Sequence, residues 1–241
     1  PDPGESHDRF TGDVGLPFGE TDPAKDVLVD SIRDEARPLL EKFGADRPEY
    51  RLEKFREAVT DLLLWVEENG RVFPWRMTVD PWKVYTSEIL LKKTRADAVG
   101  NIYEDFYRVF PGPGSIREAS DEKIKSEVRS LGLENERLKT LRSVADHLAD
   151  FGDEVPASEQ ALRKPWGVGR YAGRATLIFA FGRSMGLVDT NFERVLRRVF
   201  DLELPTQPHK DDEVHELYDA LAPSDPGICR AYSLAILDLG S

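Results

Sequence analysis

Apolar side chains recur along most of this chain at intervals of three and four residues, the spacing that lines one face of an α-helix. In the segment 50–69, for example, Phe55, Val59 and Leu62 follow this spacing. The strict alternation of apolar and polar residues that marks a β-strand is nearly absent. The pattern therefore predicts an all-α protein of short helices joined by short loops.

The boundaries of these helices are indicated by capping and turn residues. Asp80-Pro81 supplies a cap and a first-turn proline for one helix, and Asn69-Gly70 ends another. The helices predicted in this way cover residues 25–43, 50–69, 80–97, 99–109, 121–130, 135–151, 157–163, 170–181, 190–199, 211–221 and 227–239. Residues 1–24 are rich in Pro, Gly and Asp without periodicity, and we expect them to form an extension. The acidic helix at 25–43 fits a brace within the fold, a surface for a partner or a solvated helix equally well.

Composition places the chain among soluble globular proteins, since 40% of its 241 residues are hydrophobic and 32% are charged. No apolar run approaches the roughly 20 residues that span a bilayer, and the acidic start lacks the features of a signal peptide. We therefore expect a cytoplasmic protein without a membrane partner. The single cysteine, Cys229, excludes an intramolecular disulfide and any all-cysteine metal site built from this chain alone.

The formal net charge of −12 argues at first against nucleic acid, because affinity for DNA comes largely from neutralising phosphates. The charge is unevenly distributed, however. Residues 1–50 hold 6 basic and 13 acidic side chains, whereas residues 163–198 hold 8 basic and 2 acidic ones and residues 71–95 hold 6 and 2. This asymmetry is compatible with a DNA-facing side on an acidic body.

The stretch Pro165–Tyr171, between two predicted helices, is the most informative segment. Gly167 and Gly169 allow a tight turn and leave backbone N–H groups unobstructed at a helix start, where a phosphate can bind. A Gly-x-Gly alone is more often a plain interhelical turn. Here the basic surroundings, and Asp189 about twenty residues further on, favour a functional site.

Several motifs in this chain occur together and in order in a known superfamily. They are Phe73–Arg76, Ser87–Thr94, Leu131–Asn135, Gly167–Tyr171, Phe181-Gly182 and Val188–Asn191. Residues 55–241 resemble the helix-hairpin-helix DNA glycosylases, the superfamily of endonuclease III and MutY, and are most similar to its archaeal mismatch-specific thymine/uracil branch. Pro165-Trp166 departs from the Leu-Pro usual before the hairpin.

This resemblance implies two helical lobes with the active site in the cleft between them. One lobe would be a barrel at 83–187 that contains the hairpin. The other lobe would combine residues 51–82 with residues 188–241. Residues 1–50 would form an N-terminal extension that precedes this lobe in the sequence. The resemblance also implies a monomer that acts at the nucleoid on double-stranded DNA containing a mismatch or a damaged base, which it flips out of the stack.

Asp189 matches the family's catalytic carboxylate. Breaking the N-glycosidic bond gives the sugar oxocarbenium character, and a fixed negative charge stabilises it. From local sequence alone, the simpler role of Asp189 is to cap the helix that begins at Thr190. The two roles are compatible, and the resemblance favours catalysis.

Glu88 shares a partly apolar helix face with Val84 and Leu91. Such surroundings raise a carboxyl pKa and suit proton donation to a leaving base. The alternative is a surface pair with Lys92, four residues further along the helix. Because Ser87–Thr94 matches a family motif, we favour a role in the base pocket.

Tyr171 stands where endonuclease III-like members carry a lysine that attacks the sugar. A phenol does not form a Schiff base, so the resemblance implies a monofunctional enzyme without β-lyase activity. It also implies that Tyr171 forms a wall of the base pocket; the alternative is a core aromatic.

The resemblance further implies which residues bind DNA. These are the hairpin residues Gly167, Val168, Gly169 and Arg170, together with Lys92 and Lys93. The simpler role of the two lysines is as solvated charges.

Close relatives also bind an iron–sulfur cluster through four cysteines that follow the last predicted helix. Only Cys229 exists here. Either this is a branch of the superfamily without the cluster, or the sequence is a piece of a longer chain. For the residues of this sequence, we expect no metal and no cofactor.

The expected activity is removal of thymine or uracil mispaired with guanine. Lys92–Thr94, Leu131–Asn135 and Asp189–Phe192 look more like the thymine/uracil branch than like MutY. The alternatives are an adenine or modified-base glycosylase and a DNA-binding module without activity; retention of both Asp189 and Glu88 argues against the latter.

Overall fold

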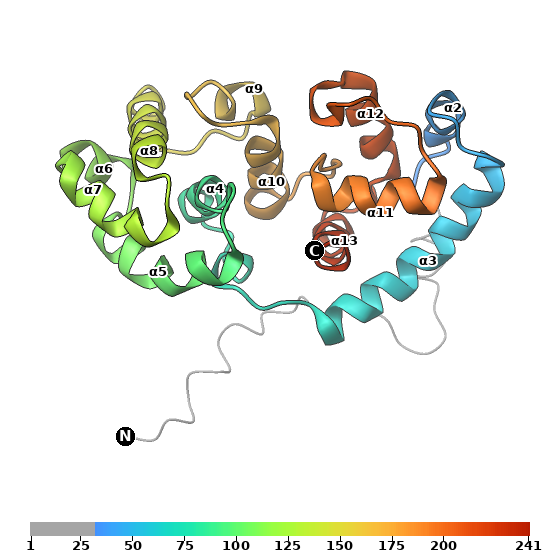
Figure 1. The fold of residues 1–241 in the computed structure, drawn as a ribbon, viewed down its shortest axis with the longest axis horizontal. Helices are drawn as coiled ribbons and strands as arrows, with labels where there is room; N and C mark the ends of the chain where they lie inside the picture. The colour runs from blue at the N-terminus through green and yellow to red at the C-terminus, as the bar shows by residue number, and fades with distance from the viewer. Residues whose placement is uncertain (1–31) are drawn as a thin grey trace, which may run out of the picture. The chain divides into compact units, whose positions relative to one another are not determined.

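The computed structural model describes residues 32–241, and they are helical with no β-strand among them (Figure 1). The prediction of an all-α protein is therefore confirmed. The described residues divide into two compact units, one made of residues 32–71 together with Ser184–Ser241, the other of Val72–Arg183. Among the helices of the described residues, none is long and apolar enough to cross a membrane.

The first unit joins the beginning and the end of the described chain. Its helices are α2 (Ala36–Lys42), α3 (Pro48–Asn69), α11 (Thr190–Phe200), α12 (Asp212–Leu221) and α13 (Pro226–Leu239), with a short 3-10 turn at Pro208–Lys210. Helix α13 packs on α3 and α11. Aromatic rings fill the space between them: Phe55 meets Phe200 with centroids 5.0 Å apart, and Tyr232 contacts both Phe55 and Phe192.

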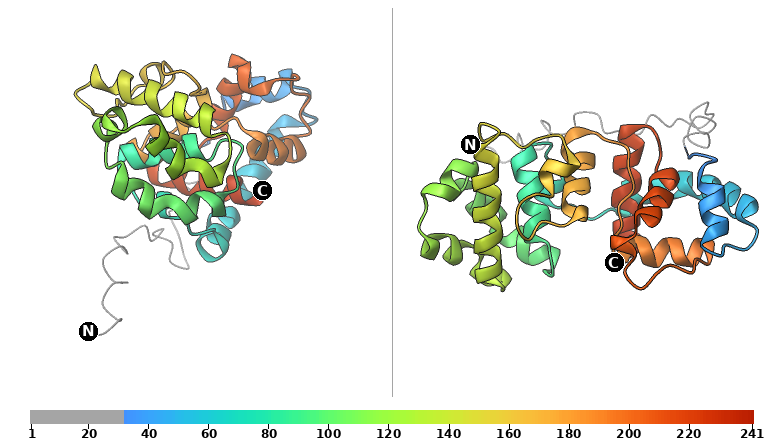
Figure 2. Two further views of the ribbon diagram at one scale, coloured as in Figure 1. Left: turned by 60° about the vertical axis from the view of Figure 1, so that its left-hand side comes forward. Right: turned by 90° about the horizontal axis from the view of Figure 1, so that it is seen from above.

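The second unit runs from green to brown in Figure 1. Its helices are α4 (Pro81–Leu90), α5 (Ala96–Val109), α6 (Pro113–Glu118), α7 (Asp121–Val128), α8 (Glu134–Ala149), α9 (Glu159–Leu162) and α10 (Arg170–Phe181), with 3-10 turns at Pro74–Arg76 and Arg129–Leu131. Helix α4 packs on α10, and α8 lies against α6 and α7 (Figure 2). Tilted and edge-on aromatic rings pack together elsewhere in this unit, namely those of Trp75, Tyr103, Tyr107, Phe106 and Phe110.

Most predicted helices are found within one or two residues of their expected ends, and α10 coincides with the prediction 170–181. The caps explain this agreement. The carboxylate of Asp80 accepts from the backbone N–H groups of Trp82 and Lys83 at 2.9 and 3.2 Å, which fixes the start of α4. Asp189, Asp211 and Asp225 cap α11, α12 and α13 in the same way.

Two helix predictions need correction, and one helix was missed. The helix expected at 80–97 ends at Leu90, and a new helix starts at Ala96, because Lys93 between them has a left-handed backbone with φ +56°. Of the helix expected at 25–43, residues 25–31 lie outside the described part and the helix begins only at Ala36. Helix α6 was not predicted because its six residues, which start at Pro113, are too few to show a period.

Helix α2 packs on α12 and α3, and its apolar residues Ala36 and Leu40 are fully buried. Of the three roles left open for the acidic segment, the described part of it therefore acts as a brace within the first unit.

Candidate active site

The hairpin between α9 and α10 uses its two glycines differently. Gly167 has φ +83°, and a Cβ there would lie 2.4 Å from Oγ1 of Thr140 on α8. Gly169 has an extended backbone, and a Cβ there would meet nothing within 4 Å. The first glycine is therefore required by the fold, and the second leaves open space in front of the first turn of α10.

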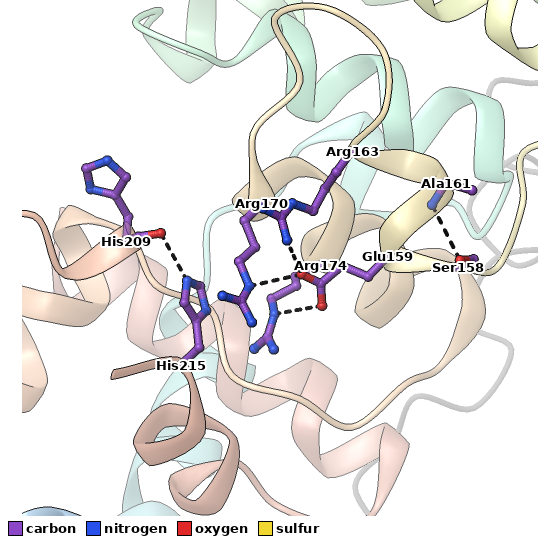
Figure 3. Close-up of polar contacts among 8 residues, drawn as sticks. All are labelled: Ser158, Glu159, Ala161, Arg163, Arg170, Arg174, His209 and His215. Carbon is purple, nitrogen blue, oxygen red and sulfur yellow. Dashed lines mark hydrogen bonds and ion pairs between the residues drawn. The ribbon is translucent and has the colours of Figure 1, made fainter. Parts of the chain in front are cut away.

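The remaining predicted hairpin residues lie at the end of the same turn and at the start of α10. Val168 and Gly169 are half-buried and exposed, respectively. Arg170 is the first residue of α10, and its Nε donates to Oε1 of Glu159 at 2.9 Å (Figure 3).

Trp166, just before the first glycine, is 45% exposed. The ammonium of Lys139 covers its ring at 3.8 Å, and its backbone N–H donates to Ser143 Oγ at 2.8 Å. The sequence Pro165-Trp166 is thus accommodated without loss of the turn.

Lys92 and Lys93 lie in the turn after α4, and both are exposed. The Nζ of Lys92 donates to the carbonyl oxygen of Gly167 at 3.1 Å, so this lysine contacts the hairpin directly. Both lysines line a hollow of about 180 Å³ together with Leu133 and Trp166. The structure therefore brings together three motifs that are far apart in the sequence: the turn after α4, the segment before α8, and the hairpin.

Arg137 holds these motifs in place, and sequence reasoning missed it. It is only 4% exposed. Its guanidinium donates to the carbonyl oxygens of Gly132 (2.8 Å), Leu90 (2.9 Å) and Lys92 (3.3 Å) and to the hydroxyl of Thr94. Burial lowers the pKa of Arg137. In the sequence this residue is one of two arginines on an amphipathic helix, and nothing there signals its burial.

Glu88 and Tyr171 lie on α4 and α10, two helices of this unit that pack against each other. Glu88 is 6% exposed, which contradicts the alternative of a surface pair with Lys92. Its helix neighbours are also buried and polar: Thr86 and Ser87 both hydrogen-bond the hydroxyl of Tyr107, at 2.6 and 2.9 Å. Tyr171 is half-buried at the first turn of α10.

Asp189 belongs to the first unit and caps α11. Its Oδ1 accepts from the backbone N–H of Phe192 at 2.8 Å, so the capping role expected from local sequence is confirmed. Burial raises the pKa of Asp189, and the hydrogen bonds from the backbone N–H groups of Phe192 and Asn191 oppose that rise. One oxygen of the carboxylate is thus fixed by the helix, and the group is held in surroundings that disfavour its charge.

The family's iron–sulfur cluster does not fit the residues of this chain. A cluster needs four thiolates, and the thiol of Cys229 is buried, donates towards the carbonyl oxygen of Met185 at 3.6 Å, and has a pKa raised by burial. Nowhere in the part of the chain that the structure describes do three His, Cys, Asp or Glu side chains cluster so that they could hold a metal ion.

A larger pocket, of about 660 Å³, lies on the first unit between α3, α11 and α13. It is lined mainly by apolar side chains, among them Tyr50, Trp65 and Val199, and contains none of the predicted site residues. The predicted residues of the second unit instead lie on the hairpin turn, on the first turn of α10, on α4 and on the turn that follows α4.

Comparisons with known proteins match this chain to DNA glycosylases and to a family of base excision DNA repair proteins. A family model of HhH-GPD superfamily base excision DNA repair proteins matches residues 86–220. A thymine/uracil-DNA glycosylase of Pyrobaculum aerophilum is 35% identical over 188 residues, covering 77% of this chain and 80% of that protein. An adenine DNA glycosylase of Mycobacterium tuberculosis is 33% identical over 190 residues, covering 76% of this chain and 60% of that protein.

A solved structure, of a thermostable thymine-DNA glycosylase, superposes with a TM-score of 0.71 at 30% identity and covers 78% of this chain and 87% of that one. The helical fold with its hairpin is that of a DNA glycosylase. The chain belongs to the HhH-GPD superfamily of base excision DNA repair proteins, as the motifs predicted, and DNA is its partner.

Proposed function

We propose that this glycosylase removes thymine or uracil mispaired with guanine. The observation that carries the proposal is the 35% identity to a thymine/uracil-DNA glycosylase over four-fifths of that relative's length. The adenine DNA glycosylase is matched over a smaller share of its own length, 60%. We further propose that the protein works as a monomer, at the nucleoid where its substrate lies.

In the proposed reaction, the target base is flipped out of the duplex before its bond to the sugar is broken. The C1′–N bond breaks and its electron pair leaves with the base, which gains a proton supplied through Glu88. The carboxylate of Asp189 stabilises the positive charge that develops on the sugar. A water molecule then adds hydroxide to C1′ and releases a proton, so the products are a free base and an abasic site.

The remaining residues bind and position. We assign the backbone of Gly167–Gly169 and the side chains of Arg170, Lys92 and Lys93 to the DNA, and Tyr171 to a wall of the base pocket. Tyr171 supports a hydrolytic enzyme without β-lyase activity, since a phenol cannot form the Schiff base that the lyase reaction needs. The carboxyl groups of Glu88 and Asp189 and one water molecule account for every bond and proton that changes in this reaction. We therefore propose that no cofactor takes part.

A panel of duplexes tests this function. Duplexes containing G·T, G·U, adenine opposite 8-oxoguanine, or a single modified base are incubated with the protein and then treated with alkali, with a matched G·C duplex as control. We expect strand scission only in the thymine or uracil strand of G·T and G·U. Cleavage confined to the adenine strand would replace the proposal with an adenine glycosylase, and no cleavage in any duplex would leave a DNA-binding module.

A further inference from the structure

Helix α8 carries a lysine, Lys139, whose ammonium stands over the ring of Trp166, 3.8 Å from the ring centroid. Two further positions of α8 hold the same segment. Thr140 lies against Gly167, and Ser143 Oγ accepts the backbone N–H of Trp166 at 2.8 Å. Helix α8 therefore contacts both the ring and the backbone that carries it, directly before the hairpin turn.

The charge of Lys139 is not taken up by a carboxylate. Within residues 32–241, its side chain has no ion pair and no hydrogen bond, and it is exposed to solvent. Trp166 forms one wall of the hollow that Lys92 and Lys93 also line, and Glu136 is the only acidic residue among the described residues of that lining. The three exposed lysines and this one exposed glutamate carry a formal charge of +2, on a chain whose net charge is −12. A local excess of this sign attracts phosphate.

One role for a lysine over a tryptophan is to cover apolar surface with its stem. The exposure of the ring argues against that role, because Trp166 is still 45% exposed with the ammonium in place. The contact instead restricts the lysine, since an ammonium is attracted to the electron-rich face of an indole and its stem is otherwise flexible. A lysine restricted in this way loses less conformational entropy when it binds an anion.

We propose that Lys139 binds a phosphate of the DNA backbone next to the hairpin, and that Trp166 is the positioning residue that holds its ammonium there. The inference adds to the DNA contacts of the proposed function, but it rests only on DNA as the partner and not on which base is excised. Trp166 is part of the departure from the usual Leu-Pro, so the hairpin motif alone does not indicate this contact.

Fluorescence anisotropy with labelled G·T and matched G·C duplexes tests the phosphate contact. We expect Lys139→Gln to weaken binding roughly tenfold at about 50 mM salt and roughly threefold at about 200 mM, because one phosphate contact contributes about 0.9 to the magnitude of the slope of log K against log salt. The factor should be the same for both duplexes, since phosphate contacts carry no sequence information. Lys139→Arg keeps the charge and should bind as the original chain does.

The matched control is Lys83→Gln. Lys83 also lies over an aromatic ring of the second unit, that of Tyr107 at 6.0 Å, but it is near the start of α4, whereas Lys92 and its contact with the hairpin lie beyond the end of that helix. Both variants remove one positive charge, so an effect of net charge alone would appear in both. Equal losses in the two variants, or an unchanged salt slope for Lys139→Gln, would overturn the inference.

Trp166→Leu tests the positioning role. It keeps an apolar side chain and the backbone N–H that Ser143 accepts, but it removes the ring face. We expect roughly two- to fivefold weaker binding with an unchanged salt slope, because the charge of Lys139 remains while its position is lost. Trp166→Phe restores an aromatic face and should recover part of the loss.

A double-mutant cycle separates positioning from direct contact. In a Lys139→Gln background, Trp166→Leu should cause no further loss, because the side chain that the ring positions has lost its charge. The same loss in both backgrounds would mean that the ring itself contacts DNA, and the positioning role would be wrong.

Excision by the unmodified chain is measured alongside on the panel of duplexes. If thymine or uracil is removed while Lys139→Gln binds with the original salt slope, only this inference fails. If adenine is removed instead while Lys139→Gln lowers the slope, the proposed function fails and the phosphate contact stands.

Discussion

A Cβ atom on Gly167 would lie 2.4 Å from Oγ1 of Thr140, closer than any real contact of that kind. Thr140 is on α8, and its own hydroxyl donates to the Glu136 carbonyl oxygen at 2.9 Å, so it is held in place by its helix. The hairpin therefore rests on α8 through a position that only glycine fits. Gly169, two residues further on, has no such neighbour.

The two glycines should consequently respond differently to alanine. We expect Gly167→Ala to lower the free energy of unfolding by about 3 kcal/mol, from the strain at positive φ and the overlap with Thr140. Gly169→Ala should change it by less than about 0.5 kcal/mol. Urea unfolding of both variants measures the difference. Equal losses would show that the hairpin is not fixed by its contact with α8.

A bulkier side chain at Gly169 tests the role of the backbone in DNA binding. Because the surrounding space is open, Gly169→Leu should fold, but its side chain would cover the amides at the start of α10. Phosphate contacts carry no sequence information, so binding to matched and mismatched duplexes should weaken by the same factor. Parallel titrations of the two duplexes measure this. A loss limited to the mismatched duplex would show that the turn reads the lesion instead.

The helical fold was predictable from sequence because local signals decide it. Caps such as Asp80 and Asp225 act within three residues of their own position, and the apolar period of α10 lies entirely within the helix. The end of α4 was not predictable in this way. Arg137, more than forty residues away, donates to the carbonyl oxygens of Leu90, the last residue of α4, and of Lys92 in the turn that follows, and no local pattern contains that information.

The candidate site also combines features that the sequence predicts with contacts that only the structure shows. Lys92 and Gly167 were each singled out from family motifs, but their direct hydrogen bond depends on tertiary packing. Glu159 was not singled out, because a glutamate that follows Ser158 looks like an ordinary first-turn residue until the partners across the hairpin are seen. Residue types were thus predictable, and the partners that orient them were not.

Arg137 should be essential to the turn that carries Lys92 and Lys93. Arg137→Met keeps much of the apolar volume but leaves the carbonyl oxygens of Leu90 and Gly132 without their donor. We expect a loss of about 2–4 kcal/mol in the free energy of unfolding, since buried groups that lose a charged partner are costly. Arg95→Met, at an exposed arginine nearby, is the control and should be nearly neutral. A nearly neutral Arg137→Met would mean that water replaces the guanidinium.

The absence of an amine at Tyr171 predicts how the product behaves. Abasic sites should accumulate as unbroken strands until alkali or heat is applied, and borohydride added during the reaction should trap no covalent complex with DNA. Gel electrophoresis before and after alkali, with and without borohydride, measures both. A strong adduct would show that another amine, such as that of Lys92 or Lys93, attacks the sugar, and the hydrolytic assignment would be wrong.

Replacing Asp189 with asparagine separates its two roles. Asparagine can accept the hydrogen bond from Phe192 and so keep the cap, but it lacks the negative charge that would stabilise the sugar cation. The variant should therefore fold and bind the mismatch. Its single-turnover excision rate should fall by about 10²–10³-fold, the loss typical for one such electrostatic group. Excision at nearly the original rate would leave Asp189 as a cap only.

The pH dependence of stability and of excision should then have opposite signs. Burial raises the pKa of Asp189 in the folded state above its unfolded value, so folding favours the protonated form. Its contribution to stability is present below the unfolded pKa, about 3.9, and is lost as pH rises through the folded pKa. Asp189→Asn cannot ionise, so its stability relative to the original chain should increase as the pH is raised from about 4 to about 7, as measured by thermal unfolding.

Excision by the original chain requires the ionised carboxylate of Asp189, so the excision rate should instead fall as the pH is lowered through the same pKa. If the stability difference and the excision rate changed at unrelated pH values, the group that limits the reaction would not be Asp189.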